Sequence, residues 1–241
     1  MVVLQPIPLN YVFGVAQSGV LMPDREWVSV PAPEGWMAGW GKVYKELLDT
    51  PEEELRDLNV SRVPRELERA LKVAEINPSA LDILELASGD GSVACYLAKL
   101  GATVEALDAL EIAVEVTRRR AKALGLEERL TARLRSIDGW DIPHGKYDVI
   151  VALQCLQYLF DRAIPRTKEI LEAIKPGGFF VYSGNILPHF ETDPPIRFIT
   201  REELQEMLEG WTLHSFGEDE ILLKKDDLRG YIWVVARKPI R

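Results

Sequence analysis

Hydrophobic and polar positions alternate regularly from Asn77 to about residue 182, where short apolar runs are separated by amphipathic stretches. Apolar runs of this length predict buried strands, and apolar positions that recur every three to four residues predict helices. The predicted strands are 81–86, 103–107, 130–134, 147–153 and 178–182, and the predicted helices are 92–100, 111–124 and 163–174. This alternation predicts an α/β fold, in which a doubly wound parallel sheet is covered by helices on both faces.

The pattern changes after Thr200. A helical stretch at 201–208 is followed by two further predicted strands, 211–218 and 231–236. We expect these two strands to be antiparallel to each other. The sheet would then have seven strands, mostly parallel, with the last strand antiparallel.

The N-terminal third of the chain does not show the strand and helix alternation of the region after Asn77. Residues 1–35 lack clear periodicity and contain several prolines, which prevent a long helix. We predict an extended arm with a hairpin around residues 14–19, then about three helices, at 36–48, after Pro51 and at 64–75. The chain thus divides into an N-terminal arm and helical cover, residues 1–75, and a second domain, residues 76–241. The apolar run 12–22 would be unfavourable in water, so the arm should pack on its own domain or on a second subunit of a homodimer.

Composition narrows the class of protein. The 241 residues are 47% hydrophobic and carry a formal net charge of −9, so a sizeable core is expected and a nucleic-acid partner is not. The first residues lack the pattern of a secretory signal, and there is no apolar run long enough to span a membrane. We predict a cytoplasmic protein that does not associate with membranes. Its two cysteines, Cys95 and Cys155, should be reduced, and no metal site is predicted.

The candidate chemistry begins with the turn between the strand at 81–86 and the helix at 92–100. Small residues there let the backbone approach a ligand, and the free N–H groups that open a helix favour a negatively charged group. Gly89 to Ala94 satisfies G-x-G-x-x-A, and Asp108 ends the next strand, where an acid can take ribose hydroxyls. These two features alone permit a dinucleotide cofactor.

Four segments resemble the motifs of class I S-adenosylmethionine (SAM) methyltransferases. The first is Glu85 to Gly91, an acid followed by a small-x-Gly-x-Gly turn. The other three are 136–140 after the third strand, 147–154 with its acid at the start of a strand, and 175–180 with its proline-glycine-glycine turn. The family usually has glycine where this chain has Ala87. The resemblance implies a Rossmann-like fold over residues 76–238 and SAM as the cofactor.

Within this resemblance, charge and shape suggest a role for each acid. Glu85 and the Gly89 carbonyl suit the ammonium of SAM, Asp108 suits the ribose diol, and Asp138 suits the adenine amino group. Asp90 could orient the amino-acid end or cap the following helix. Trp140 could lie against the adenine or in the core, whereas Asp148 should be a turn or strand-edge residue. The implied cofactor contacts are Glu85, Ala87, Gly89, Asp90, Gly91, Asp108, Ala109, Asp138, Gly139, Trp140, Leu153 and Gln154.

The methyl acceptor should meet the ends of the fourth and fifth strands and the N-terminal cover. The candidates are polar and aromatic: Trp36, Trp40, Tyr44, Gln157, Tyr158 and Asn185. His189 is the one histidine placed to act as a base, although it lies among prolines in a predicted loop. Cys155 should be a packing residue. The run Arg118 to Arg120 should be a solvated helix face.

Residues 163–178, 196–204 and 209–211 look like the tellurite-resistance and thiopurine-type branch of small-molecule methyltransferases. In that branch an acidic stretch such as 217–220 leads into the last hairpin. This resemblance implies a small soft acceptor, such as a thiol or a selenium or tellurium oxyanion, although the acidic charge balance disfavours anion capture. Two alternatives stay open: a SAM-binding regulator or inactive homologue, and an NAD-dependent dehydrogenase.

Overall fold

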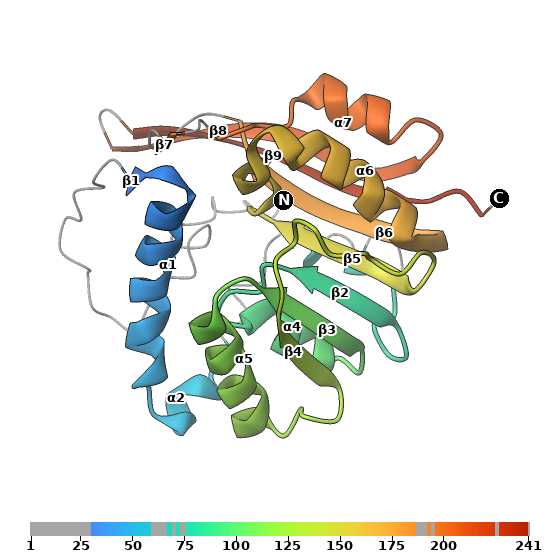
Figure 1. Cartoon of the computed structure of the whole chain (residues 1–241). Coiled ribbons are helices and arrows are strands. Elements are labelled where there is room, and N and C mark those ends of the chain that lie inside the picture. Colours follow the sequence, from blue (N-terminus) through green and yellow to red (C-terminus); the bar gives the residue numbers. More distant parts are fainter. Residues whose placement is uncertain are drawn as a thin grey trace, which may run out of the picture.

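The computed structural model describes residues 30–58, 67–68, 71–72, 76–186, 192–193, 196–224 and 227–240. Its centre is a seven-stranded sheet with the strand order β4-β3-β2-β5-β6-β9-β8 (Figure 1). The strands are β2 (Asp82–Leu86), β3 (Thr103–Asp108), β4 (Leu130–Leu134), β5 (Tyr147–Leu153), β6 (Ile174–Asn185), β8 (Thr212–Lys224) and β9 (Asp227–Arg237). This confirms the predicted α/β, doubly wound, Rossmann-like architecture.

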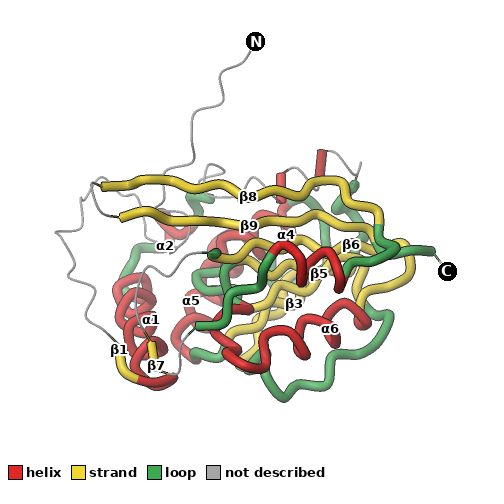
Figure 2. The backbone as a smooth tube through the Cα atoms, turned by 90° about the horizontal axis from the view of Figure 1, so that it is seen from above, coloured by secondary structure: helices red, strands yellow, loops and turns green. Residues whose placement is uncertain are grey.

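Strand direction also follows the prediction. The strands from β4 to β6 are mutually parallel, while β9 runs antiparallel to both β6 and β8. The last strand is therefore the one reversed strand of the sheet. Figure 2 shows β8 and β9 as a long pair along one edge. Both extend beyond their predicted bounds, because hairpin pairing continues past the apolar positions on which the prediction relied.

Helices cover both faces of the sheet. On one face, α4 (Ser92–Lys99) and α5 (Glu111–Leu124) pack on a core that includes Val104 and Val151. On the other, α6 (Ala163–Ala173) and α7 (Arg201–Met207) pack on a core that includes Phe180 and Tyr182. A 3₁₀ segment, η3 (Leu156–Arg162), links β5 to α6. The four helices agree with the predicted ones to within one residue at each end, because their amphipathic patterns are strong.

Ion pairs join neighbouring strands at the amino edge of the sheet. The Lys175 ammonium lies 2.9 Å from a carboxylate oxygen of Asp148 and 3.3 Å from one of Asp82, and Asp148 also accepts a hydrogen bond from the Asp82 N–H. These contacts join the first residues of three neighbouring strands. Asp148 is therefore a strand-edge residue, as predicted, and lies at the opposite end of its strand from the glycine turn.

Of the predicted N-terminal cover, the structure describes α1 (Ala32–Leu48), which packs on α5, and α2 (Glu52–Leu55). The predicted boundary at Gly35 was wrong, because α1 already begins at Ala32. Proline is tolerated there, since the first turn of a helix has no partner for its N–H groups. A short parallel pair, β1 (Val30–Pro31) with β7 (Thr192–Asp193), joins the start of α1 to the segment after β6. The predicted hairpin at 14–19 and the run 12–22 lie outside the described residues, and only part of the helix predicted at 64–75 is described.

The predicted solvated face at Arg118 to Arg120 holds for Arg118, which is exposed, but was wrong for Arg120 and only partly right for the half-buried Arg119. Arg118 donates to the Ala132 carbonyl at 3.0 Å, and Arg119 donates to the carbonyls of Leu48 and Thr50. Arg120 is 3% exposed. Consecutive residues on a helix point in different directions, so the three side chains reach three different neighbours: β4, the end of α1, and the glycine turn with α2.

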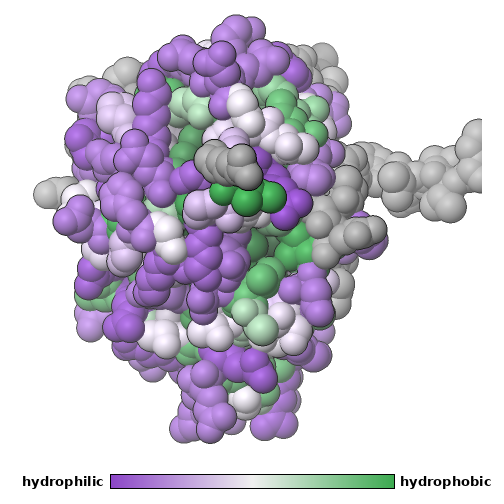
Figure 3. All heavy atoms as spheres, turned by 90° about the vertical axis from the view of Figure 1, so that its right-hand side faces the viewer, coloured by the Kyte–Doolittle hydropathy of each residue, from purple (hydrophilic) through white to green (hydrophobic). Residues whose placement is uncertain are grey.

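The described surface is mainly hydrophilic on the face shown in Figure 3, with a hollow of hydrophobic side chains near its middle. Single exposed apolar side chains include Leu134 and Ile240. Among the described helices, none has the length and apolar character needed to cross a bilayer.

Candidate functional site

The candidate site lies at the carboxyl edge of the sheet, where β2 has β3 on one side and β5 on the other. Doubly wound sheets bind ligands at such a point, because the loops on either side turn to opposite faces. The glycine turn leaves β2 here, and Ala87, Gly89 and Gly91 have φ angles of 52°, 57° and 72°. Alanine rarely adopts this left-handed conformation. Ala87, which departs from the family pattern, is therefore a strained position at the start of the turn.

Neighbouring side chains enclose the turn closely. A Cβ atom built on Gly89 would lie 2.7 Å from the Tyr44 hydroxyl, and one built on Gly91 would lie 2.6 Å from the Thr117 methyl. The Thr117 hydroxyl also donates to the Gly89 carbonyl at 3.2 Å. Any larger residue at either glycine would displace these neighbours. The sequence did not identify Thr117, whose only signal was its place on the inner face of the helix at 111–124.

Glu85 lies directly before the turn, on β2, and is 5% exposed. Its Oε2 atom is buried and has no hydrogen-bond partner in the described part of the chain. Burial, with the nearby carboxylates of Asp90 and Asp108, raises the pKa of Glu85 well above its usual value. A backbone hydrogen bond from Ala94 lowers the pKa only in part, and a buried carboxylate oxygen without a partner is costly, so a cation bound beside it would remove that cost. The ammonium of SAM is such a cation, so this atom fits the predicted cofactor.

Asp108 ends β3 and is 6% exposed. Its two oxygens accept hydrogen bonds from the backbone N–H groups of Gly89 and Leu110, each at 2.9 Å. Burial raises its pKa, and these backbone hydrogen bonds, together with one from Ala109, oppose that effect. Each carboxylate oxygen has a second lone pair, so Asp108 can still accept from the two hydroxyls of a ribose.

Asp90 has a structural role. Its oxygens accept from the Ser92 N–H at 3.0 Å and the Ser92 hydroxyl at 2.8 Å, which holds the first turn of α4. Arg120 donates to the Asp90 carbonyl and carboxylate and to the Leu55 carbonyl of α2. The N-cap of α4 is Gly91 and no side chain caps this helix, so the bonds from Ser92 to Asp90 form a turn directly before α4 and the two roles predicted for Asp90 both stay open. The buried Arg120 was missed by the sequence analysis, because its neighbours Arg118 and Arg119 made it look like part of a charged run.

The side chains on the predicted adenine side of the site are more exposed to solvent than Glu85 and Asp108. Asp138 follows β4, and its carboxylate accepts from Arg162 at 3.2 Å with both side chains about half exposed. Gly139 has a φ of 78°, and Ala109 is exposed. Trp140 packs against the core, with the Arg135 guanidinium 5.1 Å from its ring centroid. The structure thus favours the core alternative for Trp140.

The acceptor candidates gather between the end of β5 and the cover. Trp40 stacks on Tyr44 with 5.8 Å between ring centroids, and the Tyr158 hydroxyl is hydrogen-bonded with Gln157 and Trp40. Burial, followed by the charges of Asp108, Asp90 and Glu85, raises the pKa of Tyr44. Burial also raises the pKa of Tyr158. Both phenols are therefore protonated at neutral pH, and neither is a ready base.

The remaining candidates are placed as follows. Asn185 ends β6 and is 2% exposed, and Leu153 ends β5 and packs against the core. Cys155 is buried in the core, which raises its pKa and fits its predicted packing role. The Trp36 side chain and His189 lie outside the described residues. The described residues hold no group of His, Cys, Asp or Glu suited to a metal.

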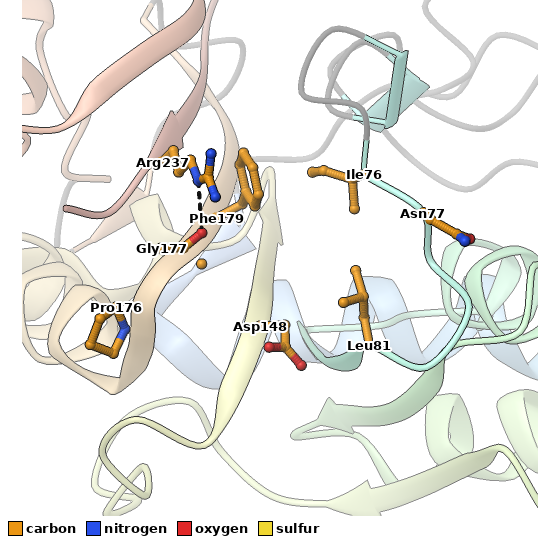
Figure 4. Close-up of a pocket in the computed structure, with 9 residues that line it drawn as sticks. Ile76, Asn77, Leu81, Asp148, Pro176, Gly177, Phe179 and Arg237 are labelled. Carbon is orange, nitrogen blue, oxygen red and sulfur yellow. Dashed lines mark hydrogen bonds between the residues drawn. The ribbon is translucent and has the colours of Figure 1, made fainter. Parts of the chain in front are cut away.

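A cavity of about 300 Å³ lies at the amino edge of the sheet, away from the glycine turn. Figure 4 shows Ile76 and Leu81 across from Phe179, with Arg237 hydrogen-bonded to the Gly177 carbonyl. None of the predicted cofactor or acceptor residues lines it. The candidate site at the carboxyl edge therefore rests on the contacts described above and not on this cavity.

This fold and the glycine turn define a nucleotide-cofactor domain of the Rossmann-like class. Residues 83–178 match the family model described as "Methyltransferase domain". This match confirms the predicted resemblance to class I SAM-dependent methyltransferases and supports SAM as the predicted cofactor.

One curated relative is the mitochondrial ubiquinone biosynthesis O-methyltransferase of Schizosaccharomyces pombe, 30% identical over 109 residues. The match covers 44% of this chain and 38% of that protein, so the chain spans well under half the length of this relative. The structure is similar to TehB from Haemophilus influenzae, with a TM-score of 0.58, 22% identity, and coverage of 73% of this chain and 63% of that one. It is also similar to the [4+2]-cyclase SpnF, with a TM-score of 0.57, 18% identity, and coverage of 73% and 81%. At these identities the two structures support the fold alone.

Proposed function

We propose that the protein is a methyltransferase that transfers the methyl group of SAM to a small molecule. The observation that carries the proposal is the buried Oε2 atom of Glu85, which lacks a partner beside a glycine turn that matches the methyltransferase model. A dinucleotide has no ammonium to place there. SAM does.

In the proposed complex, residues on three neighbouring loops hold the cofactor. Glu85 accepts from the ammonium, the turn at 87–91 receives the amino-acid tail, and Asp108 accepts from the ribose diol. Ala109, Asp138 and Gly139 face the base, and Leu153 with the backbone of Gln154 borders the methyl group. Ser88 is a further candidate contact, because its hydroxyl is buried without a partner in the described chain.

The proposed acceptor is small and soft, either a thiol or a chalcogen oxyanion. When bound, SAM supplies a methyl group whose bond to the sulfonium breaks as the acceptor sulfur bonds to the same carbon, while the thiol proton leaves to water. Alignment in a dry site contributes much of the rate of such a displacement. Trp40, Tyr44 and Tyr158 are placed to exclude water. The carboxylates of Glu85 and Asp108 lie near Tyr44, and none of the described acceptor candidates is a cation, which supports a thiol over an oxyanion.

Isothermal titration calorimetry with S-adenosylhomocysteine (SAH) and with NAD tests the cofactor. We expect SAH to bind and NAD not to bind, and the reverse result would refute the proposal. Labelled SAM with a panel of thiols, chalcogen oxyanions, amines and phenols tests the reaction. SAH binding without labelled product across the whole panel would favour a SAM-binding regulator or inactive homologue.

The cellular location, the division into domains and the oligomeric state are also proposals. We infer a cytoplasmic protein with residues 1–75 as a cover, residues 76–241 as the methyltransferase domain, and a homodimer contact through the arm. The packing of α1 on α5 supports the cover. Size-exclusion chromatography with light scattering, on the full chain and on a chain lacking residues 1–29, tests the dimer.

A further inference from the structure

Two side-chain amides follow β5 at the carboxyl edge of the sheet. Gln157 is 1% exposed, and its Nε2 atom donates to the Gln154 carbonyl at 3.0 Å. This bond fixes the orientation of the amide, because only the NH₂ group can donate to a carbonyl. Gln154 places its own Nε2 atom 3.4 Å from the Ser183 hydroxyl. In both residues the amide nitrogen is engaged within the protein.

Both amide oxygens lack such a partner. The Oε1 atoms of Gln154 and Gln157 are buried and accept no hydrogen bond from the described part of the chain. Leaving a buried carbonyl oxygen unpaired is unfavourable, so native proteins rarely keep such an atom unless something else supplies the donor. The two atoms therefore call for a ligand with N–H or O–H groups.

The local backbone holds these amides in place at some cost. Gln154 has a φ of 55°, which is uncommon for a residue other than glycine. Its N–H donates to the Ser183 carbonyl at 2.8 Å, and the Gln157 carbonyl accepts from the Arg197 N–H at 3.2 Å. Strained positions that the surrounding structure holds rigidly concentrate at ligand sites. Gln154 is such a position, next to Leu153 at the end of β5.

In the proposed complex, the hydrogen-bond donors of SAM do not point toward the two glutamine amides. In the proposed complex the ammonium meets Glu85 on β2, the ribose meets Asp108 on β3, and the base lies toward β4. The two amides follow β5, on the opposite side of β2 from β3. The neighbouring Tyr158 and Tyr44 connect them to the cover. The amides thus lie on the side where the acceptor enters.

We propose that the methyl acceptor is an uncharged molecule that donates hydrogen bonds to the side-chain oxygens of Gln154 and Gln157. This inference rests on the proposed function and narrows its acceptor. An oxyanion brings negative charge and mostly acceptor atoms to a region that already holds unpaired oxygens and the carboxylates of Glu85 and Asp108. A thiol that carries an amide or hydroxyl group fits, and a chalcogen oxyanion does not.

Matched acceptor pairs test the proposal. One pair is 3-mercaptopropanamide and its N,N-dimethyl derivative, and the other is 2-mercaptoethanol and 2-methoxyethanethiol; tellurite and selenite represent the oxyanions. A site that accepts hydrogen bonds from the substrate discriminates against an analogue whose N–H or O–H group is methylated, because the buried acceptor oxygen of the protein then stays unpaired. We expect kcat/KM for methyl transfer to be at least about tenfold higher for the donor-bearing member of each pair, mainly through a lower KM, and the oxyanions to be poorer than both.

The variant Gln157→Met keeps the approximate length and volume of the side chain but removes the amide oxygen, together with the amide nitrogen that donates to the Gln154 carbonyl. We expect it to bring the kcat/KM ratio within each pair close to one, while SAH affinity stays unchanged. Gln205→Met is the matched control, because Gln205 is exposed on α7. It should preserve the ratio. Thermal unfolding of both variants shows whether they are folded.

The outcomes separate the two proposals. If wild-type protein does not bind SAH, the proposed function fails. If it binds SAH but the capped thiols react as well as the donor-bearing ones, or an oxyanion reacts best, only this inference fails. It also fails if no member of either pair reacts and calorimetry finds no preference of the SAH-loaded protein for the donor-bearing members.

Discussion

The carboxylate of Asp108 accepts a hydrogen bond from the Gly89 N–H at 2.9 Å, although 19 positions separate the two residues in sequence. The bond joins the end of β3 to the glycine turn after β2. The side chain proposed to hold the ribose therefore also fixes the turn proposed to hold the amino-acid tail. Two parts of one cofactor would be positioned by a single carboxylate, and the hydrogen bond from Gly89 is one of those that oppose the rise in the pKa of Asp108 caused by burial.

The substitution Asp108→Ala should weaken SAH binding by about 1–3 kcal/mol, because the ribose loses its acceptor and Gly89 loses its partner. Calorimetric titration measures the change. Asp148→Ala is the matched control, since Asp148 pairs with Lys175 at the amino edge of the same sheet. It should leave SAH affinity unaltered. Equal affinities for wild type and Asp108→Ala would mean that the ribose lies elsewhere.

Glu85 makes cofactor binding dependent on pH. Its pKa is raised in the unliganded protein by burial and then by Asp90 and Asp108. A bound ammonium favours the charged carboxylate, so binding should release a proton, and affinity should rise with pH from the usual pKa of the group up to its raised value. Titrations in buffers with different heats of ionisation measure this proton release. Glu85→Gln should abolish the release and weaken binding by about 1–3 kcal/mol.

The same group has the opposite effect on the stability of the unliganded protein. Because the folded pKa of Glu85 lies above the unfolded value, folded protein binds more protons, and the free energy of unfolding should fall as pH rises through this range. Glu85→Gln should therefore unfold at higher urea than wild type at neutral pH, with the difference vanishing below the usual carboxyl pKa. A difference that persists in acid would assign the effect to packing.

The glycine turn offers a test of close packing. Gly89→Ala should destabilise the protein and abolish SAH binding, because its Cβ atom would lie 2.7 Å from the Tyr44 hydroxyl in addition to the strain of a φ of 57°. Gly125→Ala is the control, with a φ of 67° and open space around the Cβ position. It should cost only the backbone strain, about 1–2 kcal/mol.

Combining Gly89→Ala with Tyr44→Phe isolates the contact. Removing the hydroxyl leaves the nearest ring carbon at 3.4 Å, so the double variant should recover part of the lost stability in urea unfolding. If Tyr44→Phe gives no recovery, the loss in Gly89→Ala comes from the backbone alone. Tyr44 would then be less closely seated on the turn than the structure places it.

Local patterns predicted the elements between residues 82 and 174 closely. The strands β4 and β5 and the helix α5 have the predicted bounds, because each is a strongly periodic segment with a turn at both ends. The start of α1 was misplaced, because Pro33 reads as a helix breaker in sequence but is harmless in a first turn. Propensity alone does not show which turn of a helix a proline will occupy.

The site was predictable where a motif is continuous and not where it depends on distant partners. Glu85 to Gly91 is a contiguous motif, and its geometry follows from the strand and helix on either side. The unpaired oxygens of Gln154 and Gln157 and the buried Arg120 depend on which side chains the fold brings near. No spacing in the sequence encodes those contacts. The arginine run was therefore assigned to solvent although one member is buried.

Arg120 is expected to be the most important arginine of that run for stability. Its guanidinium is buried, pairs with Asp90 at 3.1 Å and donates to the Leu55 carbonyl, so it joins α5 to the glycine turn and to α2. Removing one partner of a buried pair leaves the other charge uncompensated, and Arg120→Met should therefore cost about 3–5 kcal/mol in the free energy of unfolding. Urea unfolding followed by circular dichroism measures this loss.

Arg133→Met is the control, because Arg133 also pairs with a carboxylate, that of Glu105 at 2.9 Å, but its side chain is 53% exposed. An exposed pair contributes at most about 1 kcal/mol, so this variant should unfold nearly as wild type does. Adding Asp90→Asn to Arg120→Met should restore part of the stability, since the unpaired charge is then removed. Equal losses in Arg120→Met and Arg133→Met would contradict the structural role assigned to Arg120 and would return the whole run to the solvated face that its sequence first indicated.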